Sequence, residues 1–158
     1  MTRRVLPTLM LLLVVGVALA AGATQPLATA ASNVAGLEVD LTSVERKGSV
    51  LTVKWAVRNT GTAKVRVQFL LTGQQVTTYL VDEENGTKYF ALTDSEGSTL
   101  ASEHEYIGSN THGIDDEVEA GATKRFWAKF PAPPPEVHEV SVFFTEAEPI
   151  EGVAITDK

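Results

Sequence analysis

The chain has 158 residues, a formal net charge of -7 at pH 7 and no cysteine. This length allows one domain with a sizeable hydrophobic core, and the lack of cysteine excludes disulfides, thiolate metal sites and thiol catalysis. The negative charge argues against nucleic acid and anionic membranes as general partners, because like charges repel within a Debye length.

The first residues have the pattern of an export signal. Arg3 and Arg4 precede an apolar run from Leu6 to Ala20, and small residues follow. The sequence therefore predicts a signal peptide and cleavage region over residues 1–31, and a protein that is secreted, periplasmic or extracellular. An uncleaved membrane anchor is the alternative; without it we expect no membrane span. Cleavage is predicted after Ala20, Ala23 or Ala30.

The rest of the chain predicts one β-rich domain over residues 37–155, after a flexible tether at 32–36 and before a short tail at 156–158. Apolar and polar residues alternate in short runs, as in strands with one buried face. The clearest runs lie between Ser49 and Leu71 and predict a β-hairpin that turns at Asn59-Thr60-Gly61-Thr62. Its predicted buried face consists of Leu51, Val53, Trp55, Val57, Val65, Val67 and Phe69.

Further strands are predicted on both sides of an Asn85-Gly86 turn, after Ala122 and after Val137. The polar stretch Ser98 to Gly121 predicts a long loop that is either functional or hides a short irregular strand. Seven or eight short strands with regular turns predict an all-β fold, an immunoglobulin-like antiparallel β-sandwich with Trp55 between its sheets. A closed barrel is the alternative.

Three motifs carry a family resemblance, namely Val57 to Gly61, Tyr79 to Tyr89 and Glu119 to Thr123. Together they resemble the bacterial extracellular immunoglobulin-like family of unknown function that includes secreted immunoprotective antigens. The resemblance implies a secreted, non-enzymatic β-sandwich and transfers no catalytic or ligand residue. The turn at Asn59 and the segment Thr72-Gly73-Gln74 are also similar to a bacterial proteinase-inhibitor domain, which implies an inhibitory loop within residues 98–121.

Acidic residues and histidines are the candidate metal ligands. Carboxylates gather at 82–84 and 115–119, but their spacing does not match a calcium loop, so we expect a solvated acidic surface. Methionine and cysteine are absent after the leader, which disfavours a soft transition-metal site. We therefore expect no metal, no cofactor and no catalytic residue. The histidines are His104, His112 and His138.

Two sets of side chains predict a ligand surface. If Phe126 points into the core, Trp127 points outward between Arg125 and Lys129, and an exposed indole beside cations can stack on a sugar ring. The alternative is that Trp127 is covered by the long loop or by the stems of the two cations. The outward side of the predicted hairpin adds a basic stripe, partly neutralised by neighbouring carboxylates. This stripe consists of Lys54, Arg58, Lys64 and Arg66.

The sequence thus predicts a secreted, non-catalytic binding or structural accessory of the cell envelope or extracellular space, whose partner is an envelope or extracellular protein or glycan. A proteinase inhibitor acting through residues 98–121 is the alternative, and a calcium-dependent adhesion module is the third hypothesis.

Overall fold

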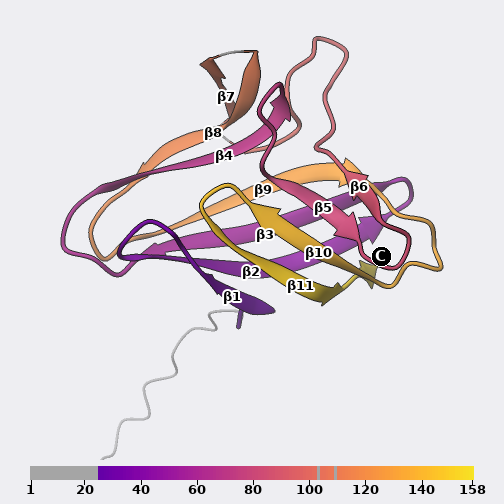
Figure 1. Ribbon diagram of the computed structural model, residues 1–158, viewed down its shortest axis with the longest axis horizontal. Coiled ribbons are helices and arrows are strands. Elements are labelled where there is room, and N and C mark those ends of the chain that lie inside the picture. Colours follow the sequence, from indigo (N-terminus) through magenta and orange to yellow (C-terminus); the bar gives the residue numbers. More distant parts are fainter. Residues whose placement is uncertain (1–24, 103, 109) are drawn as a thin grey trace, which may run out of the picture.

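The computed structural model describes residues 25–102, 104–108 and 110–158, with the backbone alone at 104–106 (Figure 1). The predicted signal-peptide residues up to 24, with Ala20 and Ala23, lie outside the described residues. The described part is all-β and contains no helix. Its strands are β1 (Ala28–Ala31), β2 (Leu37–Lys47), β3 (Val50–Asn59), β4 (Val65–Gly73), β5 (Tyr79–Asp82), β6 (Thr87–Tyr89), β7 (His104–Gly108), β8 (Thr111–Val118), β9 (Thr123–Pro131), β10 (Glu139–Phe144), β11 (Ala147–Ala154) and β12 (Thr156–Asp157).

The strands form a two-layered β-sandwich. The first layer has the order β1-β2-β3-β9, with β12 parallel to β2, and the second consists of the antiparallel sheets β11-β10-β5-β6 and β4-β8-β7. These two sheets are joined by side chains from the β10–β11 turn, because Leu70 N donates to Thr145 Oγ1 at 2.9 Å and Gln68 N to Glu146 Oε2 at 3.2 Å. In Figure 1, β10 and β11 cross over β2 and β3.

Trp55 lies at the centre of the core between the layers. Only 1% of its surface is exposed, and its ring lies 5.1 Å from Phe69 of β4, 5.5 Å from Phe144 of β10 and 6.1 Å from Phe126 of β9, measured between centroids. Its Nε1–H has no hydrogen-bond acceptor among the described residues, so Trp55 stabilises the fold through ring packing. The predicted inward residues of the Ser49–Leu71 stretch are confirmed as core, with Val65 packed against it.

The predicted Ser49–Leu71 hairpin is wrong, because β3 and β4 belong to different layers. β3 pairs with β2 and β9, whereas β4 pairs with β8. The side chain of Asn59 stabilises the connection through which the chain passes from one layer to the other. Its buried Nδ2 donates to the carbonyl groups of Ala63 at 2.8 Å and Val118 at 2.9 Å, and its Oδ1 accepts from Gly61 N. Alternation tells which face of a strand is buried, but it does not name the neighbouring strand.

The stretch Ser98–Gly121, predicted as a functional loop or as a loop that hides one short irregular strand, contains two strands. β7 and β8 form a hairpin, and β8 pairs along β4. Ile114 and Val118 of β8 are fully buried. The acidic residues between them obscured this alternation: Asp115 and Glu117 pair with cations at the start of β4, and Asp116 pairs with Lys124 of β9. Lys64 contacts Glu117 at 2.5 Å, and Arg66 Nε donates to Asp115 at 2.6 Å.

Both ends of the described chain are paired through the backbone. β1 lies in the range assigned to the signal and cleavage region, and cleavage after Ala30 would divide it. The expected flexible tether at 32–36 is instead held to the β10–β11 turn, where Asn33 N donates to Glu146 O at 2.9 Å. The tail at 156–158 contributes β12. The residues of β1 and of the 32–36 segment are mostly small, and they can still be held in place because backbone hydrogen bonds need no large side chain.

Arg46 fixes the proline connector at the end of the sandwich. Its side chain is 7% exposed and donates to the carbonyl groups of Pro134 at 2.8 Å and Val137 at 3.0 Å, while Nε contacts Asp157 at 2.5 Å. Prolines cannot donate hydrogen bonds, so this connector is anchored through its acceptors. A guanidinium group has five N–H donors, so Arg46 can bond several acceptors at once.

The central packing gives a stability prediction. Replacing Trp55 by Ala should lower the free energy of unfolding by about 3 to 5 kcal/mol, because it removes the ring that joins three aromatic neighbours across the layers. Replacing Trp127, whose side chain points outward, should cost no more than roughly 0.5 kcal/mol. Urea denaturation of both variants measures the difference, and equal losses would contradict this assignment of core and surface.

Candidate functional site

One face of the first layer collects five of the seven predicted ligand residues. β9 lies beside β3 in antiparallel register, with Trp127 opposite Lys54 and Arg125 opposite Ala56. Trp55, Phe126 and Ala128 point into the core, so their neighbours along the strands must point outward. We call this surface the β3–β9 face, made up of Lys54, Arg58, Arg125, Trp127 and Lys129.

The other two predicted residues are not on this face. Lys64 immediately precedes β4 and Arg66 lies within it, in the second layer. Their partners are Glu117 and Asp115 of β8, and the hydrogen bonds from Arg66 hold the pKa of Asp115 below its usual value. The single basic stripe expected from the hairpin therefore does not form, because its two halves belong to different layers.

The cations of β3 are already paired with carboxylates of β2. Arg58 Nε lies 2.5 Å from Asp40 Oδ2, and Arg58 Nη2 lies 2.5 Å from Glu38 Oε2. The hydrogen bond from Arg58 is the main reason why the pKa of Asp40 is lowered, and Thr29 Oγ1 of β1 also donates to Asp40 at 2.6 Å. The charge of Arg58 is therefore neutralised within the fold.

Lys54 belongs to a looser group at the other end of the face. Its Nζ lies 3.5 Å from Glu45, which also receives Lys158 Nζ at 2.9 Å. The hydrogen bond from Lys158, followed by smaller contributions, lowers the pKa of Glu45 to about 2. Both lysine side chains are about half exposed and Glu45 is partly exposed, so solvent screens the pairs and they contribute little to stability.

The outward cations Arg125 and Lys129 of β9 differ from the paired cations of β3. The side chain of Arg125 makes no hydrogen bond or ion pair within the described part of the chain, and Lys129 Nζ lies 5.8 Å from the centroid of the Trp127 ring. Trp127 itself is 37% exposed. Ser102 pairs with the backbone of Trp127, since its N donates to Trp127 O at 2.9 Å. The 98–102 segment therefore supports the edge of β9 while the indole stays exposed.

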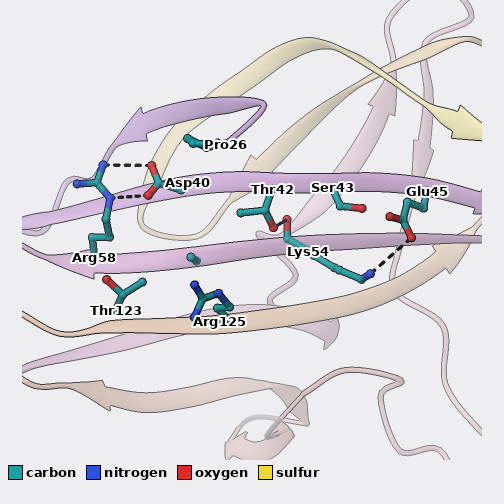
Figure 2. A pocket seen from close by; sticks show the side chains of 10 residues that line it. Pro26, Asp40, Thr42, Ser43, Glu45, Lys54, Arg58, Thr123 and Arg125 are labelled. Atoms are coloured by element: carbon teal, nitrogen blue, oxygen red, sulfur yellow. Dashed lines mark hydrogen bonds and ion pairs between the residues drawn. The ribbon is translucent and has the colours of Figure 1, made fainter. Parts of the chain in front are cut away.

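An open groove of about 640 Å³ runs along this layer (Figure 2). Figure 2 shows the Asp40–Arg58 pair at one end, the Lys54–Glu45 pair at the other, and Arg125 along one side. The cations at both ends of the groove are thus paired with carboxylates, and Arg125 supplies the cation that is available to a ligand.

Two of the other candidate metal ligands, Asp82 and Asp116, have structural partners. Asp82 accepts hydrogen bonds from the backbone and side chain of Asn85, and in that turn only Gly86 has a positive φ, of 63°. Asp116 pairs with Lys124 at 2.5 Å. Within the described ranges, no group of three or more histidine, aspartate or glutamate side chains is placed to hold a metal ion. For His104 only the backbone is described; His112 lies in β8 and His138 precedes β10.

Sequence reasoning did not single out Asp40 as a site residue. Asp40 alternates with the buried residues of β2, yet it is only 7% exposed, with β1 paired beside it and its carboxylate bonded to Thr29 and Arg58. The sequence carried no signal for β1, because Ala28–Ala31 contains no large apolar side chain.

Comparisons with protein-family models, with curated proteins and with solved structures each find no match for this chain. The resemblance carried by Val57 to Gly61 and the other motifs therefore stays a hypothesis. Residues 25–102, 104–108 and 110–158 include no helix long and apolar enough to cross a membrane.

The Asp40–Arg58 contact gives a prediction for the pH dependence of stability. A lowered pKa in the folded state means that this contact stabilises the fold above about pH 4, the ordinary range of an unfolded aspartate, and is lost as the pH falls through the folded value. Asp40→Asn should therefore cost about 1 kcal/mol at pH 7, and the difference from the parent should shrink towards pH 2.

Chemical denaturation at several pH values measures this difference. Glu96→Gln is the matched control, because this exposed side chain has no partner among the described residues. A cost of Asp40→Asn that stays constant from pH 7 to pH 2 would show that the carboxylate charge contributes nothing.

Proposed function

We propose that the protein is a secreted, non-catalytic binding module with an immunoglobulin-like β-sandwich, and that the β3–β9 face binds an acidic glycan of the cell envelope or extracellular space. The observation that carries this proposal is the exposure of Trp127 between Arg125 and Lys129 on one side of one strand. Alternate residues of a strand are about 7 Å apart, so the two cations flank the indole closely.

The chemistry of these three side chains fits an acidic sugar chain. An indole offers a flat apolar surface to the C–H groups of a sugar ring, and the cations can pair with carboxylate, phosphate or sulfate groups. Arg125 needs to break no ion pair within the described residues in order to bind. Arg58 would have to leave Asp40 and Glu38, so it contributes less to recognition.

The surroundings of Arg125, Trp127 and Lys129 favour binding of a short stretch of a glycan. β9 is held on one side by β3 and on the other by the 98–102 segment, so little conformational freedom is lost when a ligand binds. The carboxylates of Glu38 and Glu45 lie in the same layer, and the whole chain carries a charge of -7. A long polyanion would meet this repulsion, whereas a few acidic sugar units along β9 would not.

The export proposal rests on the apolar run Leu6–Ala20 that follows Arg3 and Arg4 in the sequence. The proteinase-inhibitor alternative requires an exposed loop within 98–121, and much of that segment is the β7–β8 hairpin, so no observation favours it. The calcium-dependent adhesion hypothesis likewise has no preformed site among the described residues.

Calorimetric titration with oligosaccharides that carry carboxylate, phosphate or sulfate groups tests the proposal. We expect at least one acidic oligosaccharide to bind, and an uncharged one of the same length to bind more weakly. Trp127→Ala should weaken binding by about tenfold or more, and Arg125→Gln by several-fold in a salt-sensitive way.

Lys64→Gln is the matched control, because it removes an exposed cation from the opposite layer. Binding that survives Trp127→Ala, or that falls equally with Lys64→Gln, would contradict a site on the β3–β9 face. So would the absence of binding to every acidic oligosaccharide tested.

A further inference from the structure

A second groove lies on the opposite side of the sandwich, and it is acidic. It has a volume of about 290 Å³ and lies between the β5–β6 connection, the start of β10 and β11. These segments come together at one end of the second layer (Figure 1). We propose that this groove binds a guanidinium or alkylammonium group. We call it the acidic groove, and the residues that argue for the site are Glu83, Glu84, Glu139, Ser141 and Glu151.

Four of the five carboxylates that line this groove are not paired within the described part of the chain, the exception being Asp82, which accepts hydrogen bonds from Asn85. Glu83, Glu84, Glu139 and Glu151 make no hydrogen bond and no ion pair there. Several carboxylates elsewhere in the sandwich do have cations, as in the pair between Asp116 and Lys124. No lysine or arginine lines the acidic groove, where His138 is the remaining titratable neighbour besides Asp82. The groove therefore concentrates negative potential that a cationic ligand would relieve.

Ser141 supplies an independent sign of a ligand. It lines the groove and faces outward, because its neighbours Val140 and Val142 point into the core. The residue is 0% exposed, and its Oγ has no hydrogen-bond partner among the described residues. A buried hydroxyl without a partner is unfavourable, because its lost hydration is not replaced. An N–H donor from a ligand in the groove would satisfy it.

The donor geometry favours an organic cation over a metal ion. No group of three or more acidic or histidine side chains in the described ranges is placed to hold a metal ion. A guanidinium carries five N–H donors and an ammonium three, so either can reach both Ser141 and the glutamates. The volume is at the lower end of the range for small-molecule pockets, which suits one side chain or a slender polyamine.

Nuclear magnetic resonance of the ¹⁵N-labelled protein at pH 7.5 and low salt tests the proposal. The probes are Nα-acetylarginine amide, as a model of a protein side chain, and spermidine, as a free polyamine, with calcium chloride at matched ionic strength. We expect the amide signals of Ser141 and Gly152 to move with one or both organic cations. Tighter binding of spermidine would indicate a polyamine, and tighter binding of the arginine derivative a protein side chain.

Variants separate a site from general attraction. Glu139→Gln with Glu151→Gln should weaken binding by roughly tenfold, whereas Glu96→Gln with Glu148→Gln, at exposed positions outside the groove, should leave it unchanged. Ser141→Ala should weaken binding by several-fold without lowering the Tm of the free protein, because it removes an unsatisfied hydroxyl. A purely structural serine would not give this combination.

Three results would overturn the proposal. These are shifts spread over all acidic surfaces, unchanged affinity in Ser141→Ala, and localised shifts with calcium that are tighter than those with either organic cation. The probes and the variants differ from those of the β3–β9 face, so failure at one face leaves the other result standing.

Discussion

The packing of Trp55 against Phe69, Phe126 and Phe144 sets the orientation of the strands that carry the proposed binding surface. Trp55 and Phe126 are neighbours across β3 and β9 and both point into the core. Their burial fixes the other side of each strand, so Lys54 and Trp127 must face solvent. A shift of one residue along β9 would bury Trp127 and expose Phe126. The core thus determines which side chains a ligand can meet.

Charge distribution distinguishes the two outer faces of the sandwich. Arg58, Arg66 and Lys124 each have a carboxylate partner on another strand or segment, so these charges mainly secure the fold. The β3–β9 face and the acidic groove carry charges that are not paired in this way. Arg125 on one face and the four glutamates of the groove on the other have no partner of opposite charge within the described residues. The net charge of -7 hides this division, since it sums opposite charges that lie on different sides of the molecule.

Much of the core could be predicted from the sequence, because alternation records which face of each strand is buried. Leu51, Val53 and Trp55 follow this rule. Strand partners could not be predicted in the same way: the turn after Asn59 reads as a hairpin, although the chain crosses there between layers. The strand hidden in the 98–121 stretch could not be located, because Asp115 and Glu117 resemble loop residues and their partners Arg66 and Lys64 are distant in the sequence.

The candidate site was predictable only in part. Alternation around Phe126 correctly places Trp127 outward, because both residues lie on one strand. Pairing of Arg58 with Asp40, and the separation of Lys64 from Lys54, depend on contacts between distant segments. Arg46 likewise depends on contacts with distant segments. An arginine at a strand end suggests an exposed charge, yet this side chain is buried among the carbonyl groups of the proline connector.

The two tryptophans allow a direct test of the central claim that β9 carries the ligand surface. Their indole N–H signals can be followed separately by nuclear magnetic resonance while an acidic oligosaccharide is added. The account predicts that the signal of Trp127 moves in a saturable way while that of the buried Trp55 stays in place. A Trp127 signal that does not move while the oligosaccharide binds would contradict it.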